Sequence, residues 1–262
     1  AAVNSEYKDR LFNFLFGSME NRAWTLSLYN AVNGSNYTDP EMIQINTIRE
    51  VIYLGMHNDV SFLIGDDMDL YEQQSSFNPN MPIRMLQYAG NLYEKYIKGS
   101  RLNKYGNTLL ALPVPKLVVF YNGTASVENE IILRLSDSFP EGADPDIEVR
   151  VRMLNINYGQ NQELLDHCEP LKEYAWLMKQ IRDNRKTMEI EEAIETAITS
   201  MPEEYVIKAF LETHRAEVKG MLLTEYNEAE TMELFREEGR AEGRAEGRAE
   251  GKAEGIDRKS VV

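Results

Sequence analysis

Three residues of this sequence, Asp59, Glu72 and Gln74, have side chains and a spacing that suggest chemistry. They flank Gly65 and Asp66, and a two-residue loop that begins with Gly is typical of a type II′ hairpin. In the register that this loop sets, position 59 faces position 72. Sliding the loop by one residue places position 59 opposite position 74 instead. Either register keeps the three side chains on one face, with directly opposed Cβ atoms about 4.5 to 5.5 Å apart.

This hairpin would bring the carboxylates of Asp59 and Glu72 together within a sheet. Like charges in apolar surroundings are costly unless a proton or a cation intervenes. A hard cation such as Mg²⁺, with Mn²⁺ or Ca²⁺ as substitutes, would resolve the repulsion. Two alternatives stay open. The hairpin could simply expose its acids, with residues such as Asp69 belonging to the turn, and a loop of odd length would place Gln73 opposite Asp59 and remove the site.

Apolar periodicity predicts the elements that must hold this hairpin. Three- and four-residue spacing indicates helices, and continuous apolar segments bounded by turn residues indicate buried strands. In chain order we expect two short helices within 8–32, the hairpin within 51–74, a helix over 81–99, strands over 116–121 and 147–156, and a helix over 163–183. This order is typical of an α/β fold in which a mixed sheet is flanked by helices.

The C-terminal part of the chain has a different pattern. Residues 187–235 show no strand signal and predict two or three amphipathic helices, broken at Met201 and Pro202. From Gly239 the unit Gly-Arg-Ala-Glu repeats, and each Gly in a helix costs up to about 1 kcal/mol relative to Ala. The repeat is either a solvated tail or a helix that packs through Gly and Ala in an oligomer. We therefore expect an α/β domain over 1–185, an acidic helical region over 186–238 and a repeat tail over 239–262.

The charge distribution bears on the partner. A net charge of -15 over 262 residues argues by itself against nucleic acid, because Lys and Arg supply most of the affinity for phosphate. Most of the acidity lies late in the chain, however: residues 187–238 carry a net charge of -10, whereas residues 1–186 carry only -6. Some of the acids in the first part could be metal ligands, whose charge a cation would offset.

Other features indicate the compartment. No segment approaches the roughly 20 apolar residues of a spanning helix, so we expect no membrane partner. The first residues lack a signal-peptide pattern, and the single cysteine, Cys168, cannot form an internal disulfide, which predicts a cytoplasmic protein. Because the chain begins with Ala1 rather than Met, we expect a trimmed or fragmentary N-terminus.

Several segments, in a specific order and spacing, resemble those of one known family. They are Lys8–Gly17, Asn58–Ile64, Leu70–Ser75, Asn78–Arg84, Pro115–Gly123, Asn155–Gly159, Cys168–Tyr174, Arg215–Val218 and the Glu-Gly-Arg tail. The chain resembles the recombination-promoting nucleases, the transposases of the PD-(D/E)XK nuclease superfamily. The resemblance implies a PD-(D/E)XK restriction-endonuclease-like mixed sheet with a helical C-terminal extension. It also implies a divalent-metal-dependent DNA endonuclease that hydrolyses phosphodiester bonds in recombination or transposition.

The resemblance also implies roles for individual residues. Asp59 and Glu72 would bind the metal, and the backbone carbonyl of Gln73 would add a ligand. Gln74 stands where the superfamily usually has Lys. Since Gln can orient a water molecule but cannot accept its proton, activation of the nucleophile would depend on the metal. Glu20 resembles in position an acid that many of these nucleases add from the first helix, although a helix-surface Glu is the simpler interpretation.

Basic residues on the helix after the hairpin are candidates for DNA contact. Arg84 and Tyr88 are spaced i,i+4, so they face one way and could reach a phosphate, or could equally be a solvated Arg and a core Tyr. Four further cations step by three and would form a stripe if the helix continued past Gly99: Lys95, Lys98, Arg101 and Lys104.

The missing Lys leaves a second hypothesis for the function. The fold could be a catalytically weakened nuclease that acts as a DNA-binding or oligomerising module. In either case we expect the C-terminal helices to form a homo-oligomer, since a double-strand break needs two active sites or two passes, and a symmetric dimer supplies the second site.

Overall fold

The computed structural model describes residues 10–45 and 59–227, although the side chains of Ile45 and Asp59 are outside that description. The chain divides into two compact units, one ending at Leu222 and the other beginning at Leu223. The fold and the sites below belong to the first unit.

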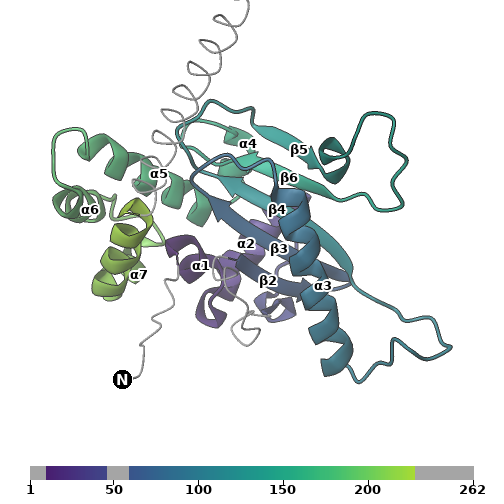
Figure 1. Cartoon of the computed structure of the whole chain (residues 1–262). Helices are drawn as coiled ribbons and strands as arrows, with labels where there is room; N and C mark the ends of the chain where they lie inside the picture. The colour runs from purple at the N-terminus through teal and green to yellow at the C-terminus, as the bar shows by residue number, and fades with distance from the viewer. Residues whose placement is uncertain (1–9, 46–58, 228–262) are drawn as a thin grey trace, which may run out of the picture. The chain divides into compact units, whose positions relative to one another are not determined.

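A six-stranded mixed sheet is the centre of this unit (Figure 1). The strands are β1 (Gln44–Ile45), β2 (Asp59–Ile64), β3 (Asp67–Gln74), β4 (Val114–Tyr121), β5 (Glu130–Arg134) and β6 (Arg150–Asn155). Their order in the sheet is β1-β2-β3-β4-β6-β5. Strands β1, β2 and β3 pair in antiparallel fashion, β3, β4 and β6 are parallel, and β5 returns antiparallel to β6. The predicted α/β class with a mixed sheet is confirmed.

The hairpin adopts the first of the two predicted registers. Ile64 pairs with Asp67 and Asp59 pairs with Glu72, so the loop consists of Gly65 and Asp66. Gly65 has a φ of 56°, which a type II′ turn requires at its first loop residue and which Gly adopts without strain. The loop therefore has an even number of residues, and position 59 stands opposite position 72.

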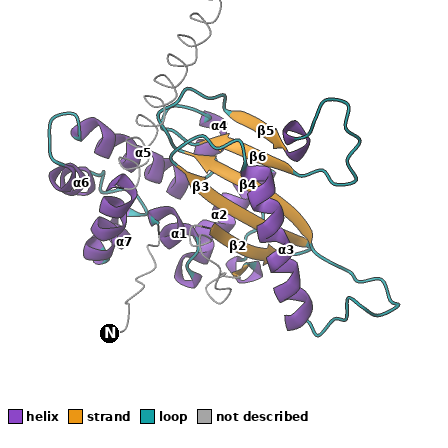
Figure 2. Ribbon diagram, viewed as in Figure 1, coloured by secondary structure: helices purple, strands orange, loops and turns teal. Residues whose placement is uncertain are grey.

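Helices cover both faces of the sheet (Figures 1 and 2). The labelled α-helices are α1 (Leu11–Phe16), α2 (Arg22–Asn33), α3 (Met81–Gly99), α4 (Gln162–Asp166), α5 (Glu169–Asn184), α6 (Ile190–Thr199) and α7 (Lys208–Thr213). Helix α3 covers one face and α1 and α2 cover the other, whereas α6 and α7 lie to the side of the sheet (Figure 1). The predicted helices within 8–32 and over 81–99 are confirmed. The predicted helix over 163–183 is instead two helices, because the chain leaves helical geometry at Cys168 and restarts with Pro170 in the first turn of α5. Strands β1 and β5 were not predicted.

Residue parity divides the sheet into two faces with separate cores. On the face of α1 and α2, the rings of Phe12, Tyr71 and Phe120 pack with centroids 5.1 to 5.2 Å apart. On the face of α3, Leu70 and Tyr121 belong to a cluster with residues of that helix. Alternate residues of β3 therefore enter different environments, and this decides what each of its polar side chains can do.

Helices α6 and α7 belong to the same compact unit as the sheet. The carboxylate of Glu173, buried on α5, accepts hydrogen bonds of 3.0 Å from the backbone amides of Val206 and Ile207. That residues 1–185 form a domain of their own stays a prediction. The repeat tail lies outside the described residues. No helix of the described part is both long enough and apolar enough to cross a membrane.

Candidate functional site

Glu72 is the centre of the candidate site, and it lies on the face of the sheet that α3 covers. Its side chain is buried, with 2% of its surface exposed. Its Oε1 atom accepts two hydrogen bonds, one of 3.0 Å from Nε2 of Gln74 and one of 2.8 Å from Nη2 of Arg84. The alternative in which the hairpin exposes its acids is therefore wrong for Glu72, because parity directs this side chain under α3.

Two buried acceptor atoms of this site lack a donor. They are Oε2 of Glu72 and Oε1 of Gln74, and neither has a hydrogen bond in the structure. The amide nitrogen of Gln74 is already engaged by Glu72 and by the sulfur of Met81, at 2.7 Å. Buried acceptors without a partner are uncommon in folded proteins, and a cation or a water molecule satisfies them. These two oxygens could therefore accept a cation or a water molecule, and by themselves they do not complete a metal site.

Asp59 is placed by its backbone alone, as the register partner of Glu72. Convergence of the two carboxylates therefore stays a prediction. Among the side chains within residues 10–44 and 60–227, no group of three or more His, Cys, Asp or Glu is arranged to hold a metal. A metal site here needs Asp59.

Gln73 points its side chain to the opposite face, toward α1. Its backbone carbonyl, which the resemblance assigns to the metal, accepts a hydrogen bond of 3.2 Å from Nη1 of Arg10, and the same nitrogen reaches Oε1 of Gln73 at 3.2 Å. A metal at this carbonyl would compete with a guanidinium for the same oxygen. Arg10 was not predicted as a site residue, because a residue that precedes a short helix carries no pattern that would place it beside β3.

Arg84 and Tyr88 face one way on α3, as predicted from their spacing. Nη2 and Nε of Arg84 lie 3.0 and 3.3 Å from the hydroxyl of Tyr88, whose ring is buried. The same guanidinium pairs with Glu72, so it is turned toward the sheet. Arg84 is thereby part of the candidate site itself, and its contact with DNA stays a prediction.

The remaining candidates are farther from Glu72. Glu20 is exposed in a 3-10 turn between α1 and α2, on the other face of the sheet, and its backbone amide bonds to Ser18. The helix α3 ends at Gly99, as the sequence suggested, which breaks the basic stripe. Arg101 follows with a φ of 54°, and Lys104 forms an ion pair with Glu94.

A second buried acid, Asp69, was missed as a candidate. It is fully buried on the face of α1 and α2, and neither carboxylate oxygen has a hydrogen bond of normal geometry. Burial raises the pKa of Asp69 to about 7, an effect that the nearby Tyr71 and Asn33 only partly offset. The register could have revealed it, because Asp69 stands opposite Phe62, a core residue.

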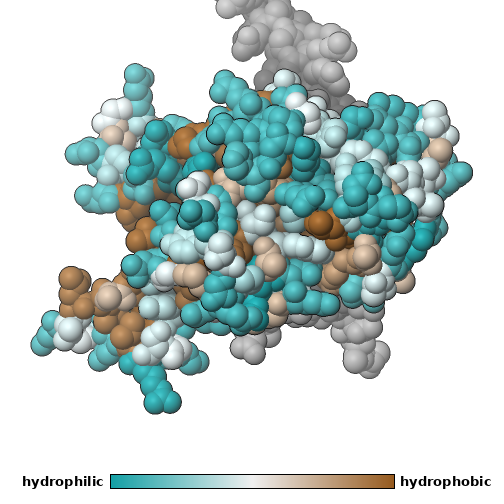
Figure 3. All heavy atoms as spheres, turned by 180° about the vertical axis from the view of Figure 1, so that it is seen from behind, coloured by the Kyte–Doolittle hydropathy of each residue, from teal (hydrophilic) through white to brown (hydrophobic). Residues whose placement is uncertain are grey.

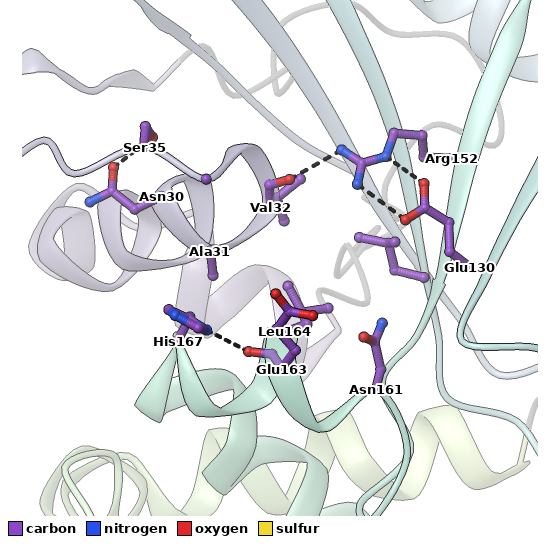
Figure 4. Close-up of a pocket in the computed structure, with 12 residues that line it drawn as sticks. Asn30, Ala31, Val32, Ser35, Glu130, Arg152, Asn161, Glu163, Leu164 and His167 are labelled. Atoms are coloured by element: carbon purple, nitrogen blue, oxygen red, sulfur yellow. Dashed lines mark hydrogen bonds and ion pairs between the residues drawn. The ribbon is translucent and has the colours of Figure 1, made fainter.

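The structure also has a hollow of about 530 Å³ away from these residues (Figure 4). Arg152 lies at its wall, where it pairs with Glu130 at 2.9 Å and donates to the carbonyl of Val32 at 3.1 Å. Its cation is thus neutralised within the fold. The hollow includes none of the residues predicted from the sequence, so it is separate from the candidate site.

Comparison of the chain with protein-family models, with curated proteins and with solved structures finds no match. The family resemblance noted from the sequence therefore stays a prediction.

Proposed function

We propose that this protein is a divalent-metal-dependent DNA endonuclease that hydrolyses phosphodiester bonds, and that Asp59, Glu72 and Gln74 form its active site. The main support for this proposal is the burial and the hydrogen bonding of Glu72. Glu72 is a buried carboxylate with one oxygen bonded by Gln74 and Arg84 and the other without a donor, in register with a second acid, Asp59.

Asp59 and Glu72 would hold the cation, most simply Mg²⁺. When bound, such a cation lowers the pKa of a coordinated water and stabilises negative charge on the phosphate. A cation binds best when both carboxylates are charged, whereas burying two like charges lowers the stability of the fold. The guanidinium of Arg84, 2.8 Å from Glu72, offsets part of their charge within the fold.

Gln74 has a defined part in this scheme. Its amide nitrogen donates to Glu72 and so fixes the orientation of the side chain. Its carbonyl oxygen, buried and without a donor, is left to accept a hydrogen bond from a water molecule. An amide oxygen orients water but takes no proton from it, so Gln74 is a positioning residue rather than a general base.

A second candidate function is favoured by the same residue. Gln74 stands in the position where the resemblance expects Lys, and its nitrogen already bonds Glu72 and Met81. The site therefore lacks the cationic, titratable side chain that a Lys would supply at this position. The protein would then be a DNA-binding or oligomerising module with weakened catalysis. Association with recombination or transposition, and a homo-oligomer formed by the C-terminal helices, belong to either proposal.

Cleavage of supercoiled plasmid separates these two functions. We expect nicked and linear products with Mg²⁺ or Mn²⁺ and none with a chelator. The Asp59→Asn variant, which nearly keeps the volume of the side chain, should bind DNA like the wild type and leave the plasmid intact. DNA binding without metal-dependent cleavage by the wild type would favour the module.

A further inference from the structure

Positive charge is concentrated in one segment of this acidic chain. Residues 95–127 contain no Asp or Glu, although the whole chain has 43 acids and a net charge of -15. The segment has five cations, which are Lys95, Lys98, Arg101, Lys104 and Lys116. Lys104 pairs with Glu94, and Lys116 lies 3.9 Å from Asp67. It runs from the end of α3, through an irregular loop over 100–113, into β4. A cationic segment of this kind attracts a polyanion even when the net charge of the protein is negative.

The same loop exposes large apolar side chains. Leu109 is 96% exposed and Tyr105 is 86% exposed, with Leu112 also at the surface. Seen from behind, hydrophobic residues gather on this protruding loop at the lower left of the surface (Figure 3). One exposed apolar residue is ordinary, but an aromatic and an aliphatic residue exposed on one loop indicate a contact surface.

A second loop of the same sheet provides a contrast. The segment over 139–149 leads into β6, the parallel neighbour of β4, so the two loops enter the sheet at the same edge. It has four acids, Glu141, Asp144, Asp146 and Glu148, and no cation. Ile147 is 55% exposed there. Exposure alone is thus common to both loops, whereas the combination of apolar side chains with positive charge distinguishes 100–113.

The helix α3 connects this loop to the candidate site. Arg84 lies beside Glu72, and Lys98 follows it on α3 after fourteen residues. The rise along the helix axis between these two residues is about 21 Å at 1.5 Å per residue. At 3.4 Å per base pair, that length equals about six base pairs of DNA. A duplex lying along α3 would therefore span the distance from Arg84, which borders the candidate site, to the loop.

We propose that the loop over 100–113 binds DNA whose base stacking is interrupted, with its cations on phosphates and with Tyr105 and Leu109 against exposed base faces. Aromatic residues stack on bases, and apolar side chains insert between base steps that are already unstacked. The proposal rests on DNA being the substrate, and it names the preferred substrate class as a duplex with a gap or another break in stacking.

The test measures binding without cleavage. Glu72→Gln protein in a chelator is titrated into two fluorescein-labelled 30-base-pair duplexes, one intact and one with a single-nucleotide gap, and anisotropy gives each Kd. We expect tighter binding to the gapped duplex. Adding Tyr105→Ser and Leu109→Ser should weaken binding to the gapped duplex by about 5- to 100-fold and remove the preference. Ile147→Ser, the matched change on the acidic loop, should leave both Kd values unchanged.

Two outcomes would overturn this assignment. The first is equal binding of both duplexes by the protein with and without the two loop substitutions. The second is that the loop substitutions lower only the oligomeric state, measured by sedimentation in the same buffer, which would assign the loop to a second copy of the chain. Neither result depends on plasmid cleavage, so failure of the proposed nuclease function is recognised separately, by the absence of metal-dependent nicking in the wild type.

Discussion

The two faces of β3 each bury one acid, and the two acids have different surroundings. Glu72, on the side of α3, has a guanidinium at 2.8 Å and an amide at 3.0 Å. Asp69, three residues earlier on the side of α1 and α2, has no guanidinium beside it, and the nearby Tyr71 and Asn33 only partly offset the burial that raises its pKa to about 7. One strand thus holds a carboxylate that is paired with a cation and another whose pKa is raised by burial.

The comparison indicates that burial alone does not make a carboxylate a good metal ligand. A ligand must be charged when the metal arrives, and a nearby positive charge or a set of donors keeps it so. Glu72 has the guanidinium of Arg84 beside it, whereas burial raises the pKa of Asp69 to about 7. Asp69 is therefore the matched control for every test of Glu72, because the two acids share a strand, a depth and a hairpin.

The largest expected effect separates the two acids by activity. Glu72→Gln should lower the rate of metal-dependent plasmid nicking by at least about 1000-fold, because it removes a charge at the proposed metal. Asp69→Asn should keep the rate within about twofold. Initial rates of nicking at saturating Mg²⁺ measure both. Equal loss in the two variants would indicate a structural need for acids in β3.

A smaller effect is expected at Gln74. Gln74→Ala should lower the nicking rate by about 10- to 100-fold. The attacking water molecule would lose the amide oxygen that orients it, and Glu72 would lose a hydrogen-bond donor. Gln74→Lys should equal or exceed the wild-type rate, because it restores a titratable group next to Glu72. A series of Gln74 variants with unchanged rates would place this residue outside the mechanism.

The ion pair makes a prediction about stability. Arg84→Gln leaves Glu72 without its cation, and because Arg84 is partly exposed we expect the free energy of unfolding to fall by about 2 kcal/mol. Added Mg²⁺ should restore more stability to this variant than to the wild type, since the metal supplies the missing charge. Thermal unfolding with and without Mg²⁺ measures the difference, and an equal gain in both proteins would argue against a metal at Glu72.

The last prediction concerns Asp69 and the pH dependence of stability. Its pKa is higher in the folded protein than in the unfolded chain, so the folded protein holds more protons between about pH 4 and pH 7. Asp69 therefore makes the free energy of unfolding fall as pH rises through this window, by at most about 1.4 kcal/mol per pH unit. Asp69→Asn should remove this slope. Urea unfolding at pH 5 and pH 8 checks the sign, and an unchanged slope in the variant would refute the assignment.

Local signals predicted the hairpin and the helix over 81–99. The sequence limited the hairpin to two registers of equal parity, and the structure adopts the one with the Gly65-Asp66 loop. The period of α3 is continuous from Met81 to Gly99. Strand β5 was missed because its side chains alternate weakly and it lies at the edge of the sheet. The contacts that decide the chemistry, Arg84 on Glu72 and Arg10 on Gln73, join residues 12 and 63 positions apart, and such pairs follow from packing rather than from spacing.

Anomalous diffraction from crystals of the full chain grown with Mn²⁺ tests directly whether Asp59 and Glu72 bind a divalent metal. We expect one ordered Mn²⁺ bound by Asp59 and Oε2 of Glu72, absent from crystals of the Glu72→Gln variant and retained in Asp69→Asn. Crystals of the wild type with no Mn²⁺ at Glu72, or with the ion at Asp69 instead, would contradict it.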